Sequence, residues 1–334
     1  MQYIILCMAN FFLKEPFHHQ VKAKLTCHDT NINNFAYLME MGTGKTITAI
    51  MDLMSLHHYE GVDNCVILAP KSVYRNWYKE ITEFVAPDKT KYAISTWDPS
   101  LKDPVTKAKL TDLLQKSIVP LNIFLMNIES LSSPKGVKFL EKYLSVQDKE
   151  KTMMIVDEST VIKTHNAKRT KNLIKLAKDI SYKRILTGTP VTKSPLDIYT
   201  QFAFLDPKIL GQTNYYAFRA RYAKIINRPT SGGRHFPLIT GYQRLDELEE
   251  KIYSAAFRVK KEECVDLPEK IYMKRFIPMS EKQLVAYESL RRNAMFIFND
   301  KTTTSVNRLS QIVKLHQVCC GFTINDQGEI HDVP

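Results

Sequence analysis

Three short polar segments in the first two hundred residues carry side chains suited to phosphate chemistry. The first is a glycine-rich loop that precedes a helical pattern at Ile47–Leu56, and its members are Gly42, Thr43, Gly44, Lys45 and Thr46. In such loops the glycines let backbone N–H groups turn toward phosphate oxygens, Lys45 reaches the β- and γ-phosphates, and Thr46 offers its hydroxyl to Mg²⁺. The strict pattern has glycine where this chain has Met39, so a plain glycine-rich turn remains the alternative.

Two adjacent carboxylates, Asp157 and Glu158, follow an apolar run at Thr152–Val156. Transfer of a phosphoryl group to water needs such a pair. Asp157 would hold the metal through its water shell, while Glu158 would orient and deprotonate the attacking water. The alternative is that the pair only caps a turn. Its place after the glycine-rich loop, in a chain that alternates strands and helices, favours the catalytic interpretation.

The third polar segment is Thr187, Gly188 and Thr189, which follow an apolar run at Arg184–Leu186. We expect its hydroxyls to sense the γ-phosphate and to pass that signal to a nucleic-acid surface. A simple polar turn is the alternative, because such turns are common between regular elements.

The elements that position these segments indicate an α/β fold. From about residue 35 to 205, apolar runs alternate with helical patterns, which is typical of βαβ units and a parallel sheet. The five predicted strands are Phe35–Leu38, Cys65–Ala69, Asn122–Met126, Thr152–Val156 and Arg184–Leu186. Because open α/β sheets bind ligands at the carboxyl ends of their strands, we expect the polar segments to meet at one edge.

The alternation of strand and helix patterns stops near residues 205–210, where we place a domain boundary. Beyond it the patterns predict a mostly helical extension with one strand and one hairpin turn. The predicted helices are Tyr215–Ile226, Leu245–Tyr253, Glu281–Phe298 and Val306–Val318; the strand is Lys270–Pro278, the turn is Asn325–Gly328, and a Gly/Pro-rich stretch covers Arg228–Pro237.

The composition is that of a folded protein outside the membrane. Of 334 residues, 44% are hydrophobic and 25% are charged, which suits two folded units. The six cysteines form no CxxC pair or His/Cys cluster. This argues against a zinc site and a secreted disulfide framework, and it favours a reducing cytoplasm. No apolar run reaches the ~18 residues that span a bilayer, so we expect neither export nor membrane insertion.

The net charge of +12 permits attraction to nucleic acid, anionic membranes or acidic proteins. Residues 161–193 hold nine basic side chains and one acid, and residues 211–245 hold six basic side chains and no acid. We expect Lys163, Lys168 and Arg169 to contact nucleic acid, with a solvated helix face as the alternative. The basic residues near Tyr215, Tyr216 and Tyr222 either clamp nucleic acid or surround an aromatic core. We expect Trp77 to pack inside the fold, with stacking on a base as the alternative.

Taken in order, these segments resemble the motifs of superfamily two helicases and translocases, most closely the Swi/Snf-like ATPases, including short phage-encoded members. Pro16–Gln20 resembles the upstream glutamine element, Glu40–Thr46 motif I, Val66–Val73 with Trp77 motif Ia, Met126–Ser130 motif Ib, Asp157–Thr160 motif II and Leu186–Pro190 motif III. Further on, Arg258–Lys270 is similar to the inter-lobe connection and Leu315–Cys320 to a helix of the second lobe's insertion. The resemblance covers about residues 16 to 325.

The resemblance implies an ATP- and Mg²⁺-dependent DNA motor with a RecA-like first lobe. Gln20 would read adenine, and Lys71, Ser72 and Asn127 would contact phosphates of double-stranded DNA without sequence preference. The implied division is a RecA-like lobe at 1–207, a helical insertion at 208–265, and an inter-lobe connection with the start of a truncated second lobe at 266–334. We expect a monomer in the cytoplasm, which is the host's cytoplasm if a phage encodes the chain.

Two departures from the family pattern bear on function. The paired carboxylates belong to a DEST segment where most relatives have DEAH or DEAQ, which keeps both acids but changes the residue that couples hydrolysis to movement. Nothing after residue 325 resembles motifs IV to VI, so the chain looks like the front half of a motor, without the second lobe's arginine finger. Three alternatives stay open: the motor subunit of a restriction or nuclease complex, a non-hydrolysing nucleotide-gated DNA-binding module, and a small-molecule kinase.

Overall fold

The computed structural model describes residues 11–30, 32–98, 119–229, 235–264, 271–298, 301–305 and 307–333, together with Ala108, Thr111 and Leu114. The chain folds as two compact units, Met1–Leu267 and Pro268–Pro334. The boundary predicted after residue 207 falls inside the first unit, and the threefold division remains a prediction. Residues 266–270 of the predicted inter-lobe connection lie outside the described residues.

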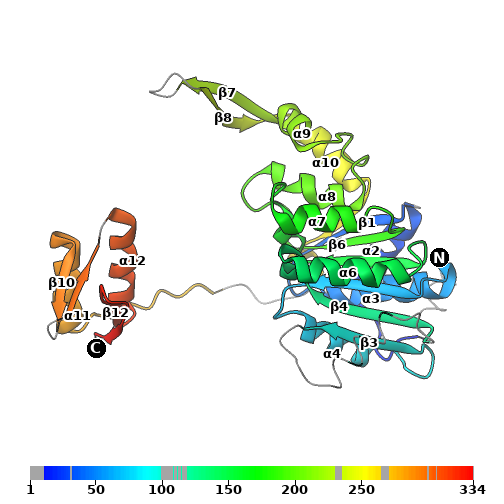
Figure 1. The fold of residues 1–334 in the computed structure, drawn as a ribbon, viewed down its shortest axis with the longest axis horizontal. Coiled ribbons are helices and arrows are strands. Elements are labelled where there is room, and N and C mark those ends of the chain that lie inside the picture. Colours follow the sequence, from blue (N-terminus) through cyan, green and yellow to red (C-terminus); the bar gives the residue numbers. More distant parts are fainter. Residues whose placement is uncertain are drawn as a thin grey trace. The chain divides into compact units, whose positions relative to one another are not determined.

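A seven-stranded parallel sheet forms the centre of the first unit (Figure 1). Its strands are β1 Asn34–Met39, β2 Asn64–Ala69, β3 Tyr92–Trp97, β4 Leu121–Asn127, β5 Thr152–Asp157, β6 Tyr182–Leu186 and β9 Ala256–Val259. Their order is β3-β4-β2-β5-β6-β1-β9, and every neighbouring pair is parallel. The α/β fold and all five predicted strands are confirmed, whereas β3 and β9 were not predicted.

Helices cover both faces of this sheet. One face packs against α2 His18–Asp29, α3 Lys45–Glu60 and α4 Tyr74–Phe84, and the other packs against α6 Pro134–Val146, α7 Lys168–Leu176 and α8 Ile198–Leu205. Successive strand residues point to opposite faces. Tyr37 of β1, for example, belongs to the first core and Leu38 to the second. Burial on both faces explains why the strands are almost continuously apolar.

A two-stranded antiparallel ribbon, β7 Ala223–Pro229 and β8 His235–Tyr242, lies between α9 Tyr215–Tyr222 and α10 Leu245–Tyr253 in the chain. The helix predicted at Tyr215–Ile226 is therefore wrong in its last turn, because the backbone there pairs with β8. The prediction of α10 is confirmed. Both ends of the Gly/Pro-rich stretch at Arg228–Pro237 belong to the ribbon, and residues 230–234 between them lie outside the described residues.

The second unit is small. Its helices α11 Glu281–Asn293 and α12 Arg308–Cys319 pack together, and its hairpins are β10 Met295–Phe298 with β11 Lys301–Thr304 and β12 Phe322–Ile324 with β13 Ile330–Asp332. The second hairpin confirms the predicted turn. The strand predicted up to Pro278 is wrong, because residues 271–280 are largely exposed and form neither helix nor strand. The first predicted helix of this unit ends five residues early, at Asn293, and its remainder includes β10.

No helix in the described part of the chain is long and apolar enough to cross a membrane.

Candidate nucleotide-binding site

The carboxyl ends of neighbouring strands bring the three predicted polar segments together. β1 ends before the glycine-rich loop, β5 ends at Asp157, and β6 ends before Thr187. Leu186 of β6 lies opposite both Tyr37 of β1 and Asp157 of β5. The ends of β2 and β4 continue the same edge of the sheet. The expected meeting of these segments is therefore found.

The glycine-rich loop turns at its two glycines. Gly42 has φ 86° and Gly44 has φ 81°, which is the left-handed region that favours glycine. Gly44 is the N-cap of α3, so Lys45 and Thr46 are its first helical residues. Buried Thr43 donates its hydroxyl to the Glu40 carbonyl at 2.7 Å. The loop thereby presents a helix N-terminus, with its free N–H groups and partial positive charge, toward an anion.

The turn after β6 packs directly against the backbone of the glycine-rich loop. A Cβ on Gly188 would lie 3.1 Å from the Met41 nitrogen and 3.2 Å from the Met39 carbonyl oxygen, so any side chain would crowd the loop. Thr187 is fully buried, and its hydroxyl accepts the Thr189 N–H at 3.2 Å. A shift of the loop would be felt at this turn, while the sensing role of its residues stays a prediction.

The paired carboxylates differ in their partners. Asp157 is 4% exposed; its Oδ2 accepts the indole N–H of Trp77 at 2.8 Å, and its Oδ1 accepts the backbone N–H of Glu158 at 2.9 Å. Burial raises the pKa of Asp157, and these bonds together with the charge of Lys45 offset only part of that effect. Glu158 Oε1 lies 3.7 Å from Lys45 Nζ, and burial raises the pKa of Glu158 as well.

Helix α4 contributes two side chains to this site that the sequence did not assign to it. Trp77 is buried, as expected for a packing residue, but it also fixes Asp157. Glu80, one turn later, faces the loop: burial raises its pKa, and a hydrogen bond with the side chain of Thr46 opposes that shift. The three-residue spacing of Trp77 and Glu80 places them on one helix face. Which elements that face meets depends on the tertiary fold.

The oxygen atoms near Lys45 fit a magnesium ion. Thr46 lies in the first turn of α3 and carries a hydroxyl. Asp157 forms no ion pair in the described part of the chain, and its two hydrogen bonds come from neutral donors. Among the described residues no group of three or more His, Cys, Asp or Glu side chains surrounds a potential metal position. One threonine hydroxyl and one carboxylate suit Mg²⁺, which usually takes one or two carboxylates, waters and substrate phosphates rather than a protein cage.

Gln20 lies against the glycine-rich loop. Its Oε1 accepts the Phe17 N–H at 2.9 Å, and its Nε2 donates to the Thr43 carbonyl at 3.4 Å. The ring of His19 contacts the same carbonyl at 2.7 Å through Nε2. Gln20 is 1% exposed, and a Cβ on Gly44 would lie 2.0 Å from its Nε2. Both ends of the amide thus bond the chain itself, and contact of Gln20 with adenine stays a prediction.

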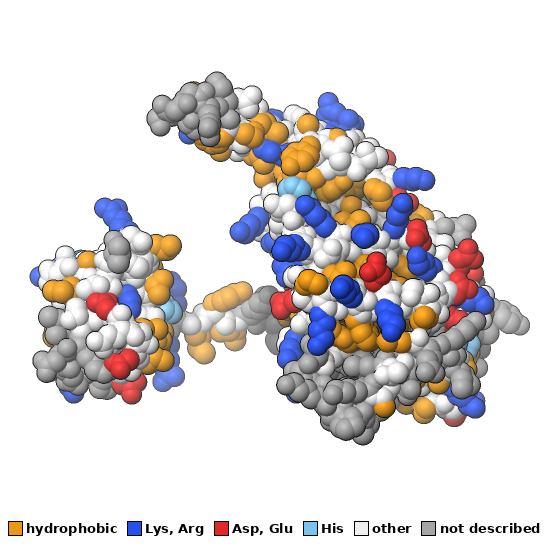
Figure 2. Space-filling model, in the orientation of Figure 1, with side chains coloured by type: hydrophobic (Ala, Val, Ile, Leu, Met, Phe, Trp, Pro, Cys, Tyr) orange, Lys and Arg blue, Asp and Glu red, His pale blue; other side chains and the backbone are white. Residues whose placement is uncertain are grey.

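The residues predicted to contact nucleic acid lie in two places in the first unit. Lys71, Ser72 and Asn127 follow β2 or end β4, and Lys163, Lys168 and Arg169 follow β5. Lys71, Ser72 and Lys168 are exposed, whereas Asn127 accepts the Glu129 N–H at 3.0 Å and Lys163 donates to the Thr192 hydroxyl. Figure 2 shows Lys and Arg side chains spread over one face of the unit, with few acids between them.

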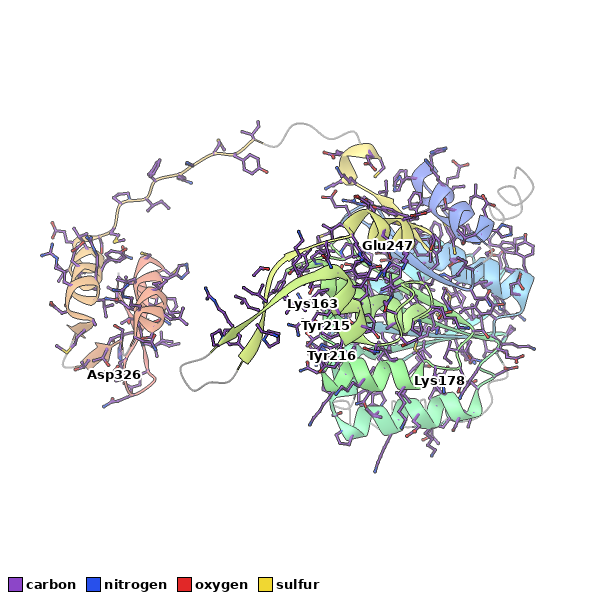
Figure 3. All side chains as sticks on the ribbon, turned by 90° about the horizontal axis from the view of Figure 1, so that it is seen from above. Lys163, Lys178, Tyr215, Tyr216, Glu247 and Asp326 are labelled. Atoms are coloured by element: carbon purple, nitrogen blue, oxygen red, sulfur yellow. The ribbon has the colours of Figure 1, made fainter. Side chains whose placement is uncertain are left out.

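The group of tyrosines and arginines after residue 214 is partly structural. The Tyr215 ring stacks on His165 at a centroid distance of 3.7 Å. Tyr222 is buried and donates to Glu247 at 2.9 Å, and Arg221 donates twice to the same carboxylate, at 2.9 and 2.6 Å. Figure 3 shows Tyr215 and Tyr216 on the side from which the β7–β8 ribbon extends. The exposed members are Tyr216, Lys224 and Arg228.

The parallel sheet, the glycine-rich loop and the carboxylate pair together define a RecA-like P-loop lobe. The family model described as "SNF2-related domain" matches residues 19–323, so the chain belongs to the SNF2-related family. The resemblance to Swi/Snf-like ATPases is confirmed; the phage-encoded subset stays a prediction.

Individual relatives agree with this family. The chain is 28% identical over 264 residues to the chromatin-remodeling ATPase INO80 of Cryptococcus neoformans, covering 76% of this chain and 14% of that protein. It is 24% identical over 304 residues to the SWI/SNF chromatin-remodeling complex subunit snf22 of Schizosaccharomyces pombe, covering 88% of this chain and 17% of that protein. The Sulfolobus solfataricus SWI2/SNF2 ATPase core, solved with dsDNA, shares the fold with a TM-score of 0.55 and 21% identity, over 92% of this chain and 58% of that chain. The chain thus spans a small part of the curated relatives and somewhat over half of the archaeal core.

Proposed function

We propose that the chain binds Mg²⁺-ATP at the carboxyl edge of its sheet and hydrolyses it to drive movement on double-stranded DNA. The convergence of Lys45, Asp157 and Glu158 at the ends of β1 and β5, with the lysine 3.7 Å from Glu158, carries this proposal. Family membership supports it, since INO80 is named as an ATPase and the archaeal ATPase core was solved with dsDNA.

Each residue of the edge has a distinct task in this proposal. The N-terminus of α3 and Lys45 hold the phosphates, and Thr46 and Asp157 hold Mg²⁺. When bound, Mg²⁺ neutralises charge on the phosphate oxygens. Glu158 orients the attacking water and accepts its proton, for which a raised pKa is suited. A phosphate that draws Lys45 toward itself also releases Glu158 for this task.

The DNA-contacting surface is proposed to follow the same edge. Lys71, Ser72 and Asn127 would contact phosphates after β2 and β4, with Lys163, Lys168 and Arg169 extending the track. Phosphate contacts carry no base information, which suits an enzyme that moves along any sequence. Thr187, Gly188 and Thr189 would transmit the nucleotide state, because their turn packs on the phosphate loop.

Steady-state phosphate release with Mg²⁺-ATP, with and without duplex DNA, tests the function. Lys45→Ala supplies the background. We expect release above that background and stimulation by DNA. Nucleotide binding without any turnover would favour the alternative of a nucleotide-gated DNA-binding module. Absence of nucleotide binding would contradict the site assignment itself. The motor subunit of a nuclease complex would show the same turnover and differs only in its partners.

A further inference from the structure

The β7–β8 ribbon takes no part in the sheet or in the nucleotide site. In the described part of the chain it pairs with no other strand, and Figure 1 shows it extending away from α9 and α10. A two-stranded ribbon alone is marginally stable in water. A binding partner that covers the ribbon would therefore stabilise it.

Apolar and cationic side chains share one face of the ribbon. Arg228 pairs with Phe236, and Ile226 pairs with Leu238, so these four side chains point to the same side. Ile226 is 48% exposed and Phe236 is 43% exposed. This face can therefore offer both charge and apolar contact to a partner.

The charge of the ribbon has a single sign. Lys224 and Arg228 are exposed and make no ion pair in the described part of the chain, and residues 207–245 contain no Asp or Glu. We infer that the ribbon enters a groove of double-stranded DNA, with Lys224 and Arg228 against phosphates and the apolar side chains against sugars and base edges. DNA grooves admit two-stranded ribbons, and apolar side chains are common in groove-binding arms. This arm presupposes the DNA binding proposed above.

The salt dependence of duplex affinity tests the ribbon. Each phosphate contact contributes about 0.9 to the slope of log K against log salt, so Lys224→Ala with Arg228→Ala should reduce the slope by nearly two. A matched control carries Lys22→Ala with Lys91→Ala, which removes two exposed cations elsewhere in the unit and should keep the wild-type slope.

An unchanged slope in the ribbon variant, with firm binding by the wild-type chain, overturns the ribbon arm and leaves the proposed function intact. If the wild-type chain binds no duplex, both fall. A protein partner is distinguished by Phe236→Ser. Its self-association is measured by sedimentation without DNA. If Phe236→Ser changes self-association, and Lys224→Ala with Arg228→Ala leaves the salt dependence of DNA binding unchanged, then the ribbon contacts a second copy of the chain.

A second, independent observation concerns a lysine over the glycine-rich loop. β9 pairs with β1 so that Val259 lies opposite Met39, and the residues after β9 follow the loop. The Lys261 N–H donates to Glu40 Oε2 at 2.8 Å. A Cβ on Gly42 would lie 3.6 Å from Lys261 Nζ. The ammonium group therefore lies beside the first glycine of the loop.

We propose that Lys261 binds the nucleotide's phosphates together with Lys45. In the described part of the chain Lys261 forms no ion pair, whereas the Nζ atom of its neighbour Lys260 lies 3.1 Å from Glu262 Oε1. Charge-assisted bonds to phosphate are strong, and the backbone bond to Glu40 holds Lys261 in place before the ligand arrives. Its contact presupposes the ATP site proposed above.

Nucleotide affinity measured by titration calorimetry with Mg²⁺-ATP and Mg²⁺-ADP tests Lys261. We expect Lys261→Ala to weaken ATP binding about tenfold, Lys261→Arg to retain most of it, and Lys260→Ala to match wild type. An equal loss for ADP would place the contact on the shared phosphates, and a larger loss for ATP would place it on the γ-phosphate. Equal ATP affinities for Lys261→Ala and Lys260→Ala overturn the assignment, while absence of ATP binding by the wild-type chain defeats the site as a whole.

Discussion

Two buried aspartates in the first unit differ in what compensates their charge. Asp52 on α3 is fully buried; its Oδ2 accepts Arg184 Nε at 2.5 Å, and Lys24 Nζ lies 3.5 Å from its Oδ1. Burial would raise the pKa of Asp52, but the charges of Arg184 and Lys24 outweigh it and lower the pKa. Asp157 receives only neutral donors, and burial prevails in raising its pKa.

The difference separates a structural acid from one that we propose to bind a ligand's metal ion. The Lys24–Asp52–Arg184 group links α2, α3 and β6, and its charges compensate each other inside the protein. Asp157 is buried at the carboxyl edge of the sheet, and no cation is bonded to it in the described part of the chain. This is the arrangement expected of a residue that receives a metal ion together with a ligand, as proposed above. Burial alone therefore does not indicate function; the sign and distance of the neighbouring charges do.

The largest effect is expected at the functional edge, from Glu158→Gln. If Glu158 is the general base, as proposed, the variant should lower phosphate release by at least about 10²-fold while ATP binding persists, because glutamine cannot take a proton. Lys45→Ala, by contrast, should abolish productive ATP binding. Unchanged turnover in Glu158→Gln, measured under the same DNA-stimulated conditions, would show that another residue is the base.

The structural acid should respond in stability instead. Asp52→Asn leaves Arg184 and Lys24 buried without their counter-charge, which is expected to cost about 3–5 kcal/mol of unfolding free energy. Denaturant titration followed by tryptophan fluorescence measures this, since both tryptophans, Trp77 and Trp97, are buried in the first unit. A loss below about 1 kcal/mol would mean that the three charges do not act as a group.

Acid should weaken the same group. Because the folded pKa of Asp52 is lowered, its stabilising contribution is complete above the unfolded pKa of about 3.9 and is lost as pH falls through the folded pKa. The wild-type chain should therefore lose stability below about pH 4 more steeply than Asp52→Asn. Parallel pH profiles of the two proteins, measured by the same fluorescence titration, would contradict this assignment.

The sequence predicted the parts of the site that depend on neighbours along the chain. The glycine-rich loop, the acid pair and the strands before them follow local patterns of glycine, charge and continuous apolar residues. Trp77 was expected only to pack, and its bond to Asp157 joins residues 80 positions apart. Lys261 reaches Glu40 across 221 positions, through a strand that pairs only at the edge of the sheet. No periodicity carries such information.

The errors have physical causes as well. β3 is a half-exposed edge strand, and β9 has only four residues, so neither shows the continuous apolar pattern of a central strand. Lys270–Pro278 has the composition of a strand, yet Ile271, Tyr272 and Phe276 are more than four-fifths exposed and the backbone of residues 271–278 joins no sheet. Strand propensity needs a partner to become a strand.

The smallest effect on stability is expected from Asp157→Asn, and it tests the comparison of the two aspartates directly. Asp157→Asn removes a buried charge but also turns an amide donor toward either the Trp77 indole or the Glu158 N–H, and these effects oppose each other. We expect the unfolding free energy to change by no more than about 1 kcal/mol, in contrast to Asp52→Asn, while phosphate release is lost. A destabilisation equal to that of Asp52→Asn would show that Asp157 is held as firmly by the fold as Asp52. The edge would then owe its charge pattern to stability rather than to a ligand.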